Sequence, residues 1–129
     1  MSLPAGYPSR RVDTLVLHSR LATAIVLYLA VLGLWGLWLA ARGAGPSPSY
    51  RGGLVIVEVA IGVQGLLGIL TWASTPPEWI HALYGVALIL AIPLAATIVR
   101  TGSPRRTSLT LGLTSFFAMG LALRGIGTA

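Results

Sequence analysis

The sequence has 129 residues, of which 55% are hydrophobic and only 9% are charged. The sequence has nine basic and three acidic residues. A chain this apolar has no soluble basic domain that could bind nucleic acid, so we expect no nucleic-acid partner. Cysteine is absent, which excludes disulfides, thiolate metal sites and cysteine nucleophiles.

Four apolar segments are each close to the length that a helix needs to cross a bilayer, about 20 residues. They cover about residues 15–40, 53–73, 79–99 and 107–123, and the last is the shortest. The sequence therefore predicts an all-α fold, an integral membrane four-helix bundle that forms one domain over residues 1–129 and contacts membrane lipid.

Turn-forming residues separate these segments. The first break, residues 42–53 (RGAGPSPSYRGG), is typical of a loop, the second (STPPE) of a tight turn and the third (RTGSPRR) of a short basic loop. The loops at one end hold five arginines and the opposite end holds four, so arginine counting favours a multi-pass protein of the plasma membrane with both termini outside.

The two histidines lie near the start of the first and third segments, at His18 and His81. Because odd-numbered spans run in the same direction, both imidazoles are expected at one depth on the outer side of the membrane. Each is followed one helical turn later by a small residue, Ala22 or Gly85, which leaves room beside the helix. Polar groups inside spans usually face the bundle interior and are candidates for function.

Histidine is a standard axial ligand of haem iron, and facing helices of a bundle can hold such a cofactor. The pattern thus predicts one haem b bound between His18 and His81. Two alternatives remain: interfacial histidines that only form hydrogen bonds to carbonyls or water, and a zinc site completed by Asp13 and Glu78. Arg20 and Arg124, on the same side, could pair with haem propionates or anchor the helices at headgroups.

The run GVQGLLGILTWASTPPEWIHALYGVALIL, residues 62–90, resembles the second histidine helix of the haem A synthase family and the helix before it. LHSRLATAIVLYL, residues 17–29, resembles that family's earlier histidine helix. The matching positions include Gln64, Gly68 and His81. The resemblance covers about the first two-thirds of the chain.

The resemblance implies oxidation of a haem O methyl group to give haem A during cytochrome oxidase assembly. Family members usually hold two such bundles in one chain, so a half-length chain implies a homo-oligomer. The family's glutamate three residues before its first histidine is replaced by Leu15, whereas Glu78 precedes His81 by three residues and is the candidate catalytic carboxylate. The alternatives are a non-catalytic b-type haem subunit that passes electrons to a redox partner in the membrane, and a cofactor-free structural subunit.

One further acid, Glu58, lies inside the second segment, far from the histidine level. A carboxylate within a span is costly unless it is protonated or paired. We expect it to contact Arg42 or Arg51.

Overall fold

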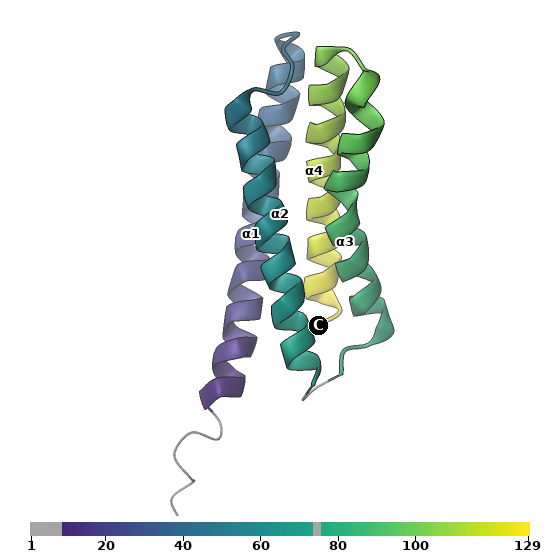
Figure 1. Cartoon of the computed structure of the whole chain (residues 1–129). Coiled ribbons are helices and arrows are strands. Elements are labelled where there is room, and N and C mark those ends of the chain that lie inside the picture. The colour runs from purple at the N-terminus through teal and green to yellow at the C-terminus, as the bar shows by residue number, and fades with distance from the viewer. Residues whose placement is uncertain (1–8, 74–75) are drawn as a thin grey trace, which may run out of the picture.

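The computed structural model describes residues 9–73 and 76–129, and these residues form an all-α bundle (Figure 1). The helices are α1 (Ser9–Ala41), α2 (Pro48–Trp72), α3 (Trp79–Ile98) and α4 (Pro104–Gly127), with a short 3₁₀ turn, η1 (Val99–Thr101), between the last two. All four helices are long and apolar enough to cross a membrane, which confirms the predicted fold class.

The second helix begins at Pro48 rather than near residue 53, so part of the predicted first loop is helical. Ser47 is its N-cap, accepting a hydrogen bond from the backbone N–H of Tyr50 at 3.1 Å, and Pro48 occupies the first turn. α4 begins in the same way, with Ser103 before Pro104. The serine and proline residues that indicated loops in the sequence therefore form the starts of these two helices.

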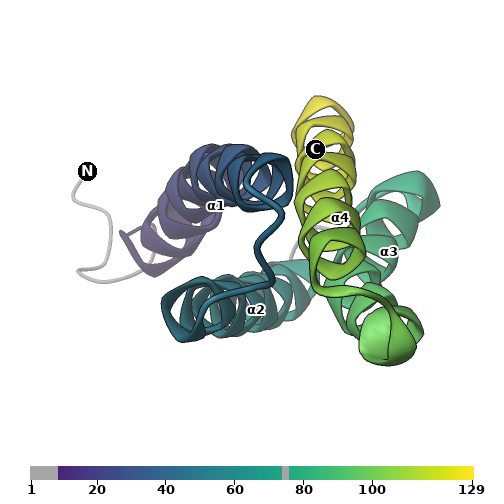
Figure 2. The ribbon, with the colours of Figure 1, turned by 90° about the horizontal axis from the view of Figure 1, so that it is seen from above.

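Packing between the helices is uneven. α1 contacts α4 most extensively, α3–α4 and α1–α2 follow, and α2–α3 share the least contact among the neighbouring pairs. Figure 2 shows α1 and α2 side by side, with α4 next to α1 and α3 beyond α4. The closest approach is between α1 and α4: a Cβ added to Gly36 would lie 2.7 Å from the Cα of Gly112. Glycines let the two backbones meet here.

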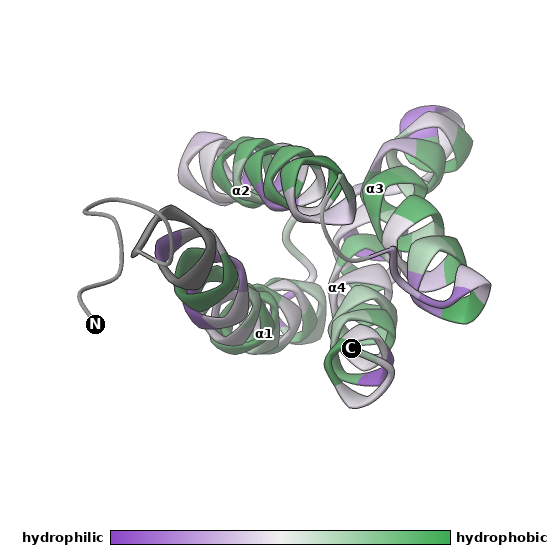
Figure 3. Cartoon of the chain, turned by 90° about the horizontal axis from the view of Figure 1, so that it is seen from below, coloured by the Kyte–Doolittle hydropathy of each residue, from purple (hydrophilic) through white to green (hydrophobic). Residues whose placement is uncertain are grey.

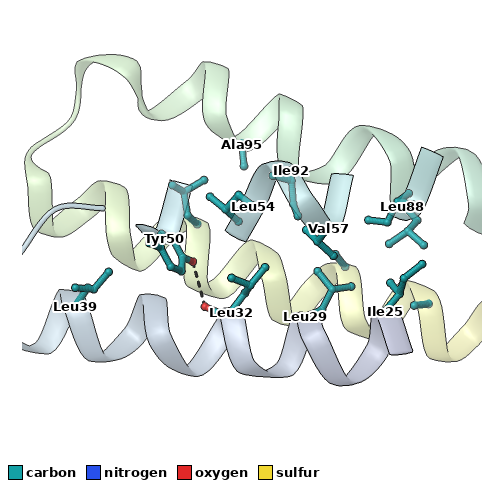
Figure 4. Close-up of a cluster of buried hydrophobic side chains, with 14 residues drawn as sticks. Ile25, Leu29, Leu32, Leu39, Tyr50, Leu54, Val57, Leu88, Ile92 and Ala95 are labelled. Atoms are coloured by element: carbon teal, nitrogen blue, oxygen red, sulfur yellow. Dashed lines mark hydrogen bonds between the residues drawn. The ribbon is translucent and has the colours of Figure 1, made fainter. Parts of the chain in front are cut away.

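The buried core runs along the middle of the bundle (Figure 4). Leu29 and Tyr50 are fully buried, and the Tyr50 hydroxyl donates a hydrogen bond to the carbonyl oxygen of Leu32 at 3.1 Å. The outside is also apolar, with many exposed leucine, isoleucine and valine side chains. In Figure 3 hydrophobic residues occur along all four helices, as expected where lipid is the solvent.

Candidate functional site

The imidazoles of His18 and His81 lie together at one end of the bundle. Their ring centres are 6.2 Å apart and the ring planes are tilted by 58°. Both rings are half-buried, and the residues that continue their helix faces, such as Ile25 on α1 and Leu88 on α3, are buried in the core. The expected meeting of the two histidines is therefore seen in the fold.

His81 is oriented by the carboxyl end of α4. Its Nδ1 lies 2.9 Å from the carbonyl oxygen of Gly125 and 3.3 Å from the hydroxyl of Thr128. A carbonyl oxygen can only accept a hydrogen bond, so Nδ1 carries the proton and donates it. In the neutral ring Nε2 then keeps its lone pair, which is the state in which histidine binds metals.

His18 of α1 packs against α2. The Gln64 side chain donates a hydrogen bond from Nε2 to the His18 carbonyl oxygen at 2.8 Å. A Cβ added to Gly68 would lie 3.5 Å from the His18 ring carbon Cε1, so α2 passes directly beside the imidazole. The His18 Nδ1 and the Gln64 Oε1 are buried without a hydrogen-bond partner. Buried polar atoms without partners are rare, so these two atoms keep hydrogen-bonding capacity for a ligand.

The ring spacing is compatible with a single metal ion bound from opposite sides. Each metal–imidazole bond measures about 2.0 Å, so the two nitrogens lie about 4 Å apart and the ring centres about 6 Å apart in that arrangement. The observed 6.2 Å agrees with this value. Within residues 9–73 and 76–129, no group of three histidine, aspartate or glutamate side chains gathers. The zinc alternative, which required Asp13 and Glu78 beside the histidines, therefore has no support in the described part of the chain.

The small residues beside the histidines leave different amounts of space. Ala22 is half-buried on the face of α1 that carries His18. Gly85 is exposed, and a Cβ added to it would meet nothing within 4 Å. The side of α3 that carries Gly85 is thus uncovered by the rest of the described chain.

The charged residues near the histidines take exposed positions. Arg124 is in the last turn of α4, at the histidine end. Arg20 is only two residues after His18, so it leaves α1 about 200° around the helix from the imidazole. Glu78 is the N-cap of α3 with extended backbone, and its side chain makes no capping hydrogen bond. Because it lies before the first helical turn, the helical spacing expected to bring its carboxylate onto the His81 face does not apply.

One feature of the site was outside the sequence-based predictions, and one prediction elsewhere in the bundle was wrong. The contact of His81 with Gly125 could not be anticipated, because a backbone carbonyl leaves no mark on residue identity. Glu58 was expected to pair with Arg42 or Arg51, yet its Oε1 is buried without a hydrogen-bond partner. Arg42 instead stacks over the ring of Trp38, with its guanidinium carbon 4.7 Å from the ring centre.

Comparison of the chain with protein-family models, with characterised proteins and with solved structures finds no match. The fold itself defines the class of protein: a bundle of four helices suited to cross a membrane.

Proposed function

We propose that the chain is a membrane haem protein in which His18 and His81 are the two axial ligands of one haem b. The observation that carries the proposal is the 6.2 Å separation of the two ring centres, which suits a single iron between them. The bond from His81 to the Gly125 carbonyl adds support, because it leaves the other ring nitrogen free to coordinate.

Small residues beside both histidines support the proposal. Gly85 leaves the space beside His81 open, and Gly68 allows the His18 ring to lie against α2. Arg124 supplies a cation at the aqueous end of the site, where propionates would be placed. A bound haem supplies reversible one-electron redox chemistry at its iron, and the chain's residues hold and orient it.

The optical spectrum of the purified protein tests the ligand pair. The wild type is expected to show a low-spin haem signal, and His18→Ala or His81→Ala should lose it, with partial recovery on adding free imidazole. Ser19→Ala, next to His18 but on another side of α1, is the matched control and should keep the signal. A full low-spin spectrum in either histidine variant would contradict the proposal.

For the reaction, we propose haem A synthase-like oxidation of a haem O methyl group, on the resemblance of residues 17–29 and 62–90 to that family. Water would supply the oxygen atom, and a redox partner in the membrane would accept the electrons removed from the methyl group. Glu78 is the carboxylate proposed to accept or relay protons, and a homo-oligomer would bring two bundles together. Cells that make haem O and express the chain should then yield haem A on extraction. Glu78→Gln should reduce that yield while leaving bound haem b unchanged.

A second candidate is a non-catalytic b-type haem subunit that passes electrons within the membrane. It is favoured by the position of Glu78, which lies before the first turn of α3 with its side chain exposed. In the described part of the chain neither imidazole is hydrogen-bonded to a carboxylate. The same extraction separates the candidates, because this subunit would give only haem b and unchanged haem O.

A further inference from the structure

A hollow of about 450 Å³ opens at the end of the bundle opposite the histidines. Its walls come from the first loop, the start of α2, the end of α3 with η1, and the start of α4, and include Gly45, Arg51, Val99, Arg100, Pro104 and Thr107. Figure 2 views this end, with α2 and the end of α3 on either side of the first turns of α4. The volume is within the range of sites for small ligands, roughly 300 to 1,000 Å³.

The walls of this hollow are held by specific contacts. The Ser108 hydroxyl donates a hydrogen bond to the Ala44 carbonyl oxygen at 2.7 Å, which ties the first loop to α4. Gly45 lies against Pro104 so closely that an added Cβ would be 3.0 Å from the proline Cβ. The Thr107 hydroxyl contacts the Val99 carbonyl oxygen at 3.4 Å, which joins α4 to η1. The hollow is therefore a built part of the fold.

Charge at this end is strongly one-sided. Arg51 comes from α2 and Arg100 from η1, and in the described part of the chain neither makes a salt bridge. Of the three acids in the sequence, Asp13 and Glu78 lie at the opposite end. Glu58 lies seven residues further along α2 than Arg51, about 10 Å deeper in the bundle. The two guanidinium groups are thus left for an anion from outside the chain.

The carboxyl end of α3 with η1 lines the hollow together with the first turns of α2 and α4, so the partial charges of the helix ends largely offset each other and the positive charge comes from the two arginines. Arginine's planar fork binds phosphate through paired hydrogen bonds. A guanidinium group at the end of a membrane-spanning helix also lies at the depth where lipid phosphates are found. We propose that the hollow binds a phosphate group, held by Arg51 and Arg100 from opposite walls, as the headgroup of an anionic lipid or as free phosphate.

The proposal differs from general anchoring of helices by arginine. General anchoring depends on the number of arginines at this end, so any two of them would be equivalent. The hollow singles out Arg51 and Arg100, whereas Arg42 stacks on Trp38 and Arg105 does not line the hollow. Two double variants with the same net charge therefore separate the two explanations.

The test measures bound lipid by native mass spectrometry of the full chain released from mixed micelles of phosphatidylglycerol and phosphatidylcholine. The wild type is expected to retain phosphatidylglycerol, and Arg51→Gln with Arg100→Gln should lower that retention at least about tenfold. Arg42→Gln with Arg105→Gln should stay close to the wild type. Equal losses in both double variants, or no loss in the first, would overturn the proposal.

Two further measurements complete the test. Titration with inorganic phosphate in a phosphate-free detergent identifies the source: binding that depends on Arg51 and Arg100 indicates free phosphate, and binding of phosphatidylglycerol alone indicates a lipid.

If the glutamine pair does not fold, Arg51→Lys with Arg100→Lys keeps the charge but removes the planar fork. This pair should still lose part of the bound ligand, and full retention would contradict a clamp built on arginine geometry.

Discussion

The Nδ1 of His81 lies 2.9 Å from the carbonyl oxygen of Gly125, so the last turn of α4 orients the imidazole at the start of α3. Removing residues 125–129 should therefore leave the bundle folded but free the ring to rotate. Loss of an outer partner of a metal-binding histidine typically lowers metal affinity about 10- to 100-fold. We expect a loss of this size in haem titrations of the truncated chain.

The control for this truncation is Thr128→Val, which removes the longer 3.3 Å contact to His81 but keeps the Gly125 carbonyl. It also removes the hydroxyl's bonds to the carbonyl oxygens of Arg124 and Gly125. It should change haem affinity far less than the truncation does. Equal affinity of the truncated and intact chains would show that the Gly125 carbonyl does not prepare His81 for a ligand.

The open space beside His81 gives a second prediction. Gly85→Leu places a large side chain where an added Cβ meets no atom within 4 Å, so the bundle should keep its thermal stability. If a haem occupies that space, the leucine should exclude it and lower the haem content per chain. Gly62→Leu is the matched control, since Gly62 is also open but lies on α2. Equal haem content in both variants would show that the ligand does not lie beside Gly85.

Much of the fold was predictable from the sequence, because length and apolarity of a segment decide whether it can cross a bilayer. Helical spacing also puts Ile25 and Leu29 on the face of α1 that carries His18, and both residues are buried. The predicted start of the second helix, near residue 53, was wrong, because α2 begins at Pro48. Ser47 and Pro48 suit a helix start as well as a loop, and the burial of Tyr50 against Trp35 decides for the helix.

The candidate site was predictable only in outline. Span direction and depth placed His18 and His81 at one end, and their rings are 6.2 Å apart. Sequence spacing could not show that Glu78 would be an N-cap rather than a member of the first turn, because helix ends depend on backbone geometry after the prolines. The hollow between Arg51 and Arg100 joins segments about 50 residues apart, and no local pattern indicates it.

The contact of α1 with α4 predicts a sharp difference between two glycines of α4. A Cβ added to Gly112 would lie 3.0 Å from the backbone nitrogen of Leu37 and 3.1 Å from the carbonyl oxygen of Gly33. Backbone atoms cannot move aside singly, so Gly112→Ala should separate the helices and lower the free energy of unfolding by about 1–3 kcal/mol. Thermal unfolding in detergent, followed by circular dichroism, measures the change.

Gly120 is the internal control for this prediction, because it lies on the same helix and an added Cβ would meet nothing within 4 Å. Gly120→Ala should leave the stability unchanged or raise it slightly, since alanine favours helix more than glycine does. A similar loss of stability in both variants would mean that the close approach of Gly36 to Gly112 does not set the packing of α1 on α4.

The buried hydroxyl of Tyr50 gives the last prediction. It donates a hydrogen bond to the Leu32 carbonyl oxygen at 3.1 Å, and the side chain, which comes from α2, is fully buried. Hydrogen bonds between membrane helices contribute about 0.6 kcal/mol on average, so Tyr50→Phe should lower the free energy of unfolding by about 0.5–1.5 kcal/mol. Tyr28→Phe removes the hydroxyl of a more exposed tyrosine on α1 and should have a smaller effect in the same unfolding assay. If Tyr28→Phe costs as much as Tyr50→Phe, then the cost of losing the Tyr50 hydroxyl does not come from its bond to Leu32.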